Sequence, residues 1–96
     1  MRIKLEEDFL YGLENQLEFI AKDKPKTAEK FKNELLNKLK KDLQHPYHFR
    51  QSIYSGGDET IRDYIFKGYI CVYKIDEQQN SILVFGLIKF RKNFQM

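Results

Sequence analysis

Residues 61–76 read IRDYIFKGYICVYKID, and this stretch decides the fold class. Aliphatic and aromatic residues alternate with charged ones up to Gly68, where the pattern breaks and then resumes, as expected for two strands joined by a turn. The second half, YICVYKI, is apolar on both faces, which is typical of a central strand covered on both sides. The stretch therefore predicts two adjacent strands, with Arg62 and Lys67 at the rim of the core.

The sequence on either side predicts the rest of the sheet. SILVFGLIKF, residues 81–90, is again apolar on both faces and follows the turn DEQQN. FRQSIYS, residues 49–55, is strand-like and precedes the glycine-rich turn GGDE, while MRIKL at the start of the chain places Ile3 and Leu5 on one side of a two-residue period. The expected sheet is a mostly antiparallel meander of three or four strands, with one further strand from the N-terminus.

Between the first strand and the meander, the apolar period lengthens to three or four residues, which indicates helices. Glu6, Glu7 and Asp8 fall in the first turn of the first helix, where the helix dipole favours negative charge. Pro25 suits the first position of a second helix, because its missing N–H costs nothing there. The apolar stripes are Phe9, Leu10, Leu13, Leu17 and Ile20, then Ala28, Phe31, Leu35, Leu36, Leu39 and Leu43. The short break AKDKPK predicts an antiparallel helix hairpin packed on one face of the sheet, so the fold class is α+β.

The composition fits a single domain over residues 1–96. Hydrophobic residues make up 42% of the chain, enough for a core without metals or cross-links. The N-terminus carries no apolar signal segment and no window approaches the roughly 18 apolar residues of a membrane span, so a soluble cytoplasmic protein is expected. Lys and Arg number 17 against 14 Asp and Glu. The positive charge gathers in residues 22–42 and in the last eight residues, KFRKNFQM, which points to an acidic partner.

Few residues favour catalysis or metal binding. The sequence lacks the motifs of phosphate-binding loops, dinucleotide-binding folds, serine hydrolases and zinc proteases. The single cysteine, Cys71, lies in an apolar run and is interpreted as a buried apolar side chain rather than a reactive thiol. His45 and His48 either share a metal or a proton-transfer role, or simply end the helix and face solvent. No cofactor and no metal site is assigned.

Basic residues beside the predicted strands are the stronger candidates for function. Arg62 shares a strand face with Tyr64 and Phe66, the combination of charge and stacking surface that single-stranded RNA binding uses. The alternative is an ordinary ion pair at a sheet edge. Lys67, beside Gly68, is expected in a turn. The candidates for binding nucleic acid or another target are Arg50, Arg62, Lys89, Arg91 and Lys92, and any catalytic role falls to Arg62, Lys67, Lys89 or Arg91.

Two long segments resemble the RelE/ParE superfamily of bacterial toxins. QLEFIAKDKPKTAEKFKNELLNKLKKDLQHPYHFRQS, residues 16–52, resembles the helix hairpin of that superfamily. IRDYIFKGYICVYKID followed by SILVFGLIKFRKNF resembles its closing strands, with an arginine, then Gly-Tyr, then Val-Tyr and a basic ending. The resemblance implies the toxin of a type II toxin–antitoxin module, held inactive in a hetero-oligomer with a cognate antitoxin that lies across its hydrophobic and basic surface.

The resemblance leaves two targets open, DNA gyrase for ParE-like toxins and ribosome-bound mRNA for RelE-like toxins. RNA-cleaving members usually carry an arginine directly after the Gly-Tyr, where this chain has Ile70. They usually also carry a histidine or tyrosine after the last strand, where this chain offers only Phe90 and Phe94, whose rings cannot transfer a proton. The resemblance therefore favours a ParE-like gyrase inhibitor over an endoribonuclease. A third reading is a toxin that has lost its activity and acts mainly as an antitoxin partner.

Overall fold

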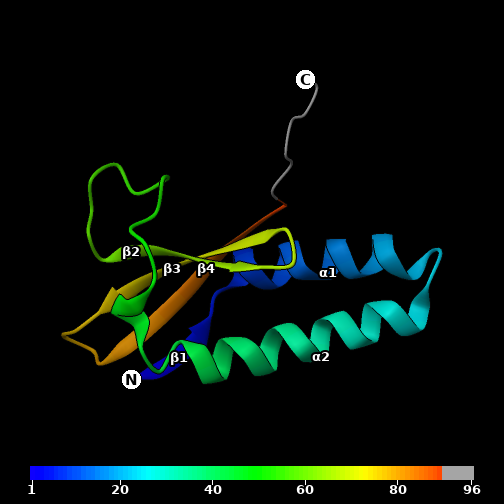
Figure 1. Ribbon diagram of the computed structural model, residues 1–96, viewed down its shortest axis with the longest axis horizontal. Helices are drawn as coiled ribbons and strands as arrows, with labels where there is room; N and C mark the ends of the chain where they lie inside the picture. Colours follow the sequence, from blue (N-terminus) through cyan, green and yellow to red (C-terminus); the bar gives the residue numbers. More distant parts are fainter. Residues whose placement is uncertain (90–96) are drawn as a thin grey trace.

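The computed structural model describes residues 1–89 of the chain and has two layers, a helix hairpin and a four-stranded sheet (Figure 1). The elements are β1 (Arg2–Leu5), α1 (Glu7–Ala21), α2 (Pro25–Asp42), the short 3₁₀ helix η1 (Pro46–His48), β2 (Ile61–Phe66), β3 (Tyr69–Asp76) and β4 (Ser81–Lys89). The α+β class and the order of elements predicted from the sequence are confirmed. None of the helices within residues 1–89 is long and apolar enough to cross a membrane.

The sheet has the strand order β1-β4-β3-β2 and is mixed. β2, β3 and β4 form the expected antiparallel meander, and β1 joins its end by pairing in parallel with β4. The β2–β3 turn consists of Lys67 and Gly68, which both have positive φ, as a tight two-residue hairpin requires. The prediction that Lys67 is a turn residue is thus confirmed.

Pro25 begins α2 as predicted, whereas α1 begins at Glu7, one residue later than predicted, with Glu6 as its N-cap. Glu7 and Asp8 lie in the first turn of α1, and Pro25 occupies the first turn of α2. The core forms where the apolar stripes of the helices meet one face of the sheet. It contains Phe9, Leu13, Phe31, Leu35, Leu39, Leu43, Tyr64, Phe66, Tyr69, Cys71, Tyr73, Ile75, Ile82 and Val84. One predicted stripe residue, Leu10, is exposed instead, because it follows Phe9 directly and so points about 100° away from it around the helix.

The predicted strand over residues 49–55 is wrong. A single bridge between Gln51 and Arg62 is all the pairing that this segment makes with the sheet. Its polar groups bond locally instead, since the hydroxyl of Ser52 accepts from the N–H of Tyr54 and the Asp58 carboxylate accepts from the N–H of Thr60. Such local bonds compete with a strand ladder. Residues 49–60, hereafter the connecting loop, therefore form an irregular segment that extends away from the helices (Figure 1).

The sheet face that points away from the helices is also apolar. Ile65, Ile70 and Ile88 lie side by side across β2, β3 and β4. Ile70 and Val72 are buried, yet they alternate with Cys71 and Tyr73 of the helix-side core and so point to the opposite face. This arrangement explains why YICVYKI is apolar at almost every position.

Candidate functional site

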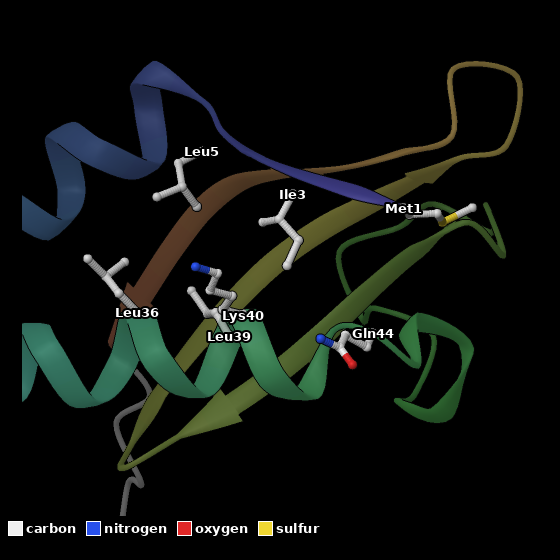
Figure 2. Close-up of a pocket in the computed structure, with 7 residues that line it drawn as sticks. All are labelled: Met1, Ile3, Leu5, Leu36, Leu39, Lys40 and Gln44. Carbon is white, nitrogen blue, oxygen red and sulfur yellow. The ribbon is translucent and has the colours of Figure 1, made fainter.

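An apolar groove runs between β1 and α2 (Figure 2). Ile3 and Leu5 point from β1 toward Leu36 and Leu39 of α2, as Figure 2 shows. The groove has a volume of about 420 Å³, and its lining is completed by Met1, Lys40 and Gln44. Its walls are therefore aliphatic, with one cationic and one amide side chain at the rim.

The edge position of β1 makes this groove accessible to a partner chain. β1 pairs with β4 on one side, and within residues 1–89 no strand pairs with its other side. An unpaired strand edge offers N–H and C=O groups to an extended peptide, and the adjacent groove offers a place for apolar side chains. The sequence analysis did not identify this site. The sequence did hold one signal for it. Leu35 already fills the core, so the adjacent Leu36 points in another direction from α2 and needs another contact.

Arg62 is not a free cation, because its guanidinium donates hydrogen bonds to main-chain carbonyls. Its Nε donates to the carbonyl of Glu59 at 2.7 Å, and its Nη1 donates to the carbonyls of Phe49 at 2.8 Å and Tyr47 at 3.3 Å. Its guanidinium also lies 5.3 Å from the ring centroid of Tyr47. These contacts join both ends of the connecting loop to β2.

The predicted stacking surface beside Arg62 is not available. Tyr64 and Phe66 do share a strand face with Arg62, but both rings are buried in the helix-side core. The hydroxyl of Tyr64 donates to Asp42 at the end of α2 at 2.6 Å. The prediction of a strand here is confirmed. The face of this strand that was predicted to bind RNA instead packs against the helices.

Arg50 forms an ion pair with a buried carboxylate. Its Nε and Nη2 donate to Asp63 Oδ2 at 3.2 and 3.1 Å, and the side chain of Asp63 is fully buried. The main-chain N–H of Ile53 also donates to this oxygen at 3.4 Å, while Asp63 Oδ1 has no hydrogen-bond partner among residues 1–89. Arg50 thus neutralises Asp63 and holds the connecting loop against β2.

The remaining candidate cations lie at the other end of the sheet. Lys67 donates from Nζ to Glu34 at 2.6 Å, and this bond lowers the pKa of the Glu34 carboxyl. Lys89 lies over the ring of Phe19 at 5.7 Å. In the strand register Lys89 opposes Tyr69, whereas Arg62 opposes Tyr73, four residues or about 13 Å along β3. The structure therefore does not gather these cations into one cluster, and Arg91 and Lys92 lie outside the described residues.

The position expected to hold a catalytic arginine is unsuited to one. Ile70 is 1% exposed and is flanked by Ile65 and Ile88 on the neighbouring strands. A charged side chain at this position would have to leave water for an apolar surface, which is strongly unfavourable.

The buried tyrosines are held in the core and so do not take the place of the missing acid or base. Burial raises the pKa of Tyr64, Tyr69 and Tyr73. Each hydroxyl already donates a hydrogen bond, to Asp42, Gln16 and the Pro46 carbonyl in that order. A hydroxyl whose proton is held in this way is a poor proton donor to a substrate at neutral pH.

Neither histidine chemistry nor cysteine chemistry gains support. Within residues 1–89 no group of three or more His, Cys, Asp or Glu side chains is placed to hold a metal ion. His45 lies between the end of α2 and η1, with its N–H donating to the carbonyl of Asp42, and His48 lies in η1. Cys71 is buried as expected, and burial raises the pKa of its thiol to about 12.

The sequence of this chain matches a known protein family. Residues 3–94 match the family described as "ParE toxin of type II toxin-antitoxin system, parDE". No curated protein sequence matches the chain. The family match covers nearly the whole chain and includes both the helix hairpin and the meander, so it confirms the resemblance to the RelE/ParE superfamily. The chain belongs to the ParE toxin family of type II toxin–antitoxin systems.

Proposed function

We propose that this toxin arrests bacterial growth by binding and inhibiting DNA gyrase. The observation that carries the proposal is the burial of Ile70, in the position where RNA-cleaving members of the superfamily usually carry an arginine. Cleavage of a phosphodiester needs charge stabilisation and proton transfer at one site. Among residues 1–89, Arg50 and Arg62 are already engaged in holding the connecting loop. An inhibitor that acts by binding needs neither group. Action on gyrase also requires a cytoplasmic location.

The antitoxin is proposed to bind along β1 and the groove beside it. An extended or helical segment of the antitoxin would place aliphatic side chains against Ile3, Leu5 and Leu36, where they gain the free energy of leaving water. Lys40 at the rim would pair with an acidic residue of that segment. Such binding covers an apolar surface that is otherwise open to solvent and yields the hetero-oligomer expected of a type II module.

The proposal is tested by inducing this chain alone in bacteria and measuring growth, gyrase activity and message integrity together. We expect growth arrest, loss of negative supercoiling by purified gyrase in the presence of the purified toxin, and intact messages by primer extension. The matched control is the same protein with the cognate antitoxin added. Codon-phased cuts in translating messages, with supercoiling unaffected, would instead establish the RelE-like alternative and refute gyrase as the target.

A further inference from the structure

A hollow between α2 and the β2–β3 turn is lined by three lysines. Its volume is about 400 Å³, and its lining consists of Glu34, Asn37, Lys38, Lys41, Phe66 and Lys67. Lys38 and Lys41 come from α2, whereas Lys67 comes from the turn, so two segments far apart in the sequence bring their cations to one place. All three side chains are exposed. An anion that enters this hollow therefore meets three ammonium groups.

The acid in this hollow is already neutralised. Lys67 donates to Glu34 at 2.6 Å, and this hydrogen bond lowers the pKa of the Glu34 carboxyl. The charges of Lys67, Lys30 and Lys38 lower this pKa further, so Lys30, one turn before Glu34, belongs to the same charged surface. None of the ion pairs within residues 1–89 includes Lys30, Lys38 or Lys41. These three residues and Lys67, hereafter the lysine face, thus carry four cations against one acid.

The two other acids of α2 do not line the hollow. Glu29 lines a separate groove between α1 and α2, and it points about 180° away from Lys38 around the helix. Asp42 accepts a hydrogen bond at 2.6 Å from the hydroxyl of Tyr64, on the side of α2 that meets the sheet. The positive charge of the lysine face is therefore not cancelled from within its own helix.

The lysine face lacks the apolar anchors of a protein-binding surface. Protein interfaces are enriched in aromatic residues and depleted in lysine, and a few large side chains supply most of their binding energy. Along α2, which the structure describes completely, no large apolar side chain is exposed. Phe66 lines the hollow but is only 8% exposed, with Lys67 Nζ 5.5 Å from its ring centroid. Phosphates need only cations to bind, so this surface fits a polyphosphate better than an acidic protein.

The lack of exposed aromatic rings also favours a duplex over a single strand. Proteins that bind single strands stack the bases on aromatic side chains, whereas a duplex presents its phosphates on the outside. Lys30 and Lys41 both lie on α2, at positions that are about 16 Å apart along the helix axis. One strand of duplex DNA carries about five phosphates over that length, so several of them can contact the lysine face together.

We propose that the lysine face binds the phosphates of duplex DNA, with one phosphate in the hollow between Lys38, Lys41 and Lys67. Such contacts position the DNA but read no bases, so the binding has no sequence preference. The inference goes beyond the proposed function, because it gives the toxin a contact with DNA that requires neither gyrase nor the antitoxin.

The test measures binding of a short fluorescein-labelled DNA duplex to the purified toxin by fluorescence anisotropy. The toxin is used without its antitoxin, so that DNA binding by the antitoxin does not contribute. The lysine variant carries Lys30→Gln, Lys38→Gln and Lys41→Gln. The matched control loses the same charge outside the lysine face, through Lys4→Gln, Lys22→Gln and Lys32→Gln. Thermal unfolding is measured first for both, and if the lysine variant fails to fold, Lys38→Gln alone replaces it, with Lys32→Gln as its control.

We expect the unaltered toxin to bind the duplex with a Kd below about 100 µM, as in other sequence-independent DNA binding. The lysine variant should bind at least about tenfold more weakly, and the slope of log Kd against log salt concentration should fall by about one for each lysine replaced. The control should lose less than about threefold in affinity. Equal losses in the two variants, or no measurable binding by the unaltered toxin, would overturn the proposal.

The variant Glu34→Gln tests the hollow itself. It removes a negative charge from the lining of the hollow and releases Lys67 from its ion pair, so a phosphate placed there should be held more tightly. We expect the affinity for the duplex to rise several-fold. Unchanged or weaker binding would overturn the placement of a phosphate in the hollow.

Two unlabelled competitors test the class of partner. A single-stranded oligonucleotide of the same length that displaces the toxin at lower concentration than the duplex would overturn the choice of a duplex. Poly-glutamate that competes as well as DNA at equal charge would overturn the choice of nucleic acid and indicate an acidic protein. Because the assay contains no gyrase, it decides DNA binding whether or not the supercoiling experiment supports gyrase as the target.

Discussion

The guanidinium of Arg50, about half exposed to solvent, binds one oxygen of the fully buried carboxylate of Asp63. Arg50→Ala leaves this carboxylate buried without its counter-charge, so we expect the free energy of unfolding to fall by about 2 kcal/mol. Urea denaturation measures the change, with Lys26→Ala on the exposed face of α2 as the control. A loss below about 0.5 kcal/mol would show that the ion pair does not stabilise the fold.

Arg62 should prove to be a structural residue. Arg62→Lys keeps the charge but cannot reach the carbonyls of Tyr47, Phe49 and Glu59 together, because an ammonium lacks the planar fork of a guanidinium. We expect the connecting loop to loosen and chymotrypsin to cut after Tyr54 several times faster than in the unaltered protein. Lys67→Ala removes an exposed ion pair with Glu34 and a contact with the Phe66 ring, both away from the connecting loop, and should leave the cleavage rate unchanged. Equal cleavage rates for Arg62→Lys and the unaltered protein would contradict this role.

The sequence pattern was sufficient for the elements whose stability is local or periodic. Pro25 and the acids Glu7 and Asp8 mark helix starts through backbone chemistry that depends on neighbouring residues alone. The alternation around Gly68 identifies the β2–β3 hairpin for the same reason. FRQSIYS contains β-forming residues but is not a strand. The hydroxyl of Ser52 bonds to the main chain locally, and the glycine turn that follows reverses the chain.

The function of the charged residues was harder to predict, because it depends on contacts between distant segments. Alternation correctly placed Arg62 on one face with Tyr64 and Phe66, but only the packed structure shows that this face meets α2. Likewise, nothing in the local sequence of Arg50 indicates that Asp63 lies opposite it. The β1 groove depends on which strand takes the sheet edge, a property of topology that no single segment records.

Cys71 should be unreactive in the folded protein. Burial raises the pKa of its thiol to about 12, so almost no thiolate is present near pH 8, and the side chain is closed to reagents. Because it is the only cysteine in the chain, a thiol-specific colorimetric reagent reports on it directly. We expect no reaction over an hour in buffer and one equivalent released at once in concentrated urea. Rapid reaction in buffer would mean that β3 opens readily.

Leu36 should matter for neutralisation by the antitoxin. Leu36→Glu puts a charge into the apolar wall of the β1 groove, and burying that charge beneath an antitoxin segment is unfavourable. We expect binding of the cognate antitoxin to weaken at least tenfold by calorimetry and co-expressed antitoxin to stop rescuing growth, with toxicity retained. Leu10→Glu, at an exposed position of α1, is the control and should still be neutralised. Full neutralisation of Leu36→Glu would place the antitoxin elsewhere.

Stability should fall in alkali, beginning with the thiol of Cys71. The folded protein raises the pKa of this thiol from 9.0 to about 12, so its contribution is complete below pH 9 and is lost as the pH rises from 9 to 12. Each group of this kind lowers the free energy of unfolding by up to about 1.4 kcal/mol per pH unit within its window. The pKa values of Tyr64, Tyr69 and Tyr73 are also raised, from 10.0, so they begin to add to the fall as the pH approaches 10 and add fully above it.

The variant Cys71→Ala separates the thiol from the tyrosines. It should be less stable than the unaltered protein at pH 8, because a buried sulfur is lost, but its free energy of unfolding should fall less steeply from pH 8 to pH 10, because only the tyrosines then contribute to the fall. The unaltered protein should lose about 1.4 kcal/mol more than the variant over the same interval. Urea unfolding at pH 8, 9 and 10 gives both curves. Parallel curves for the two proteins would show that Cys71 does not govern the first stage of alkaline destabilisation.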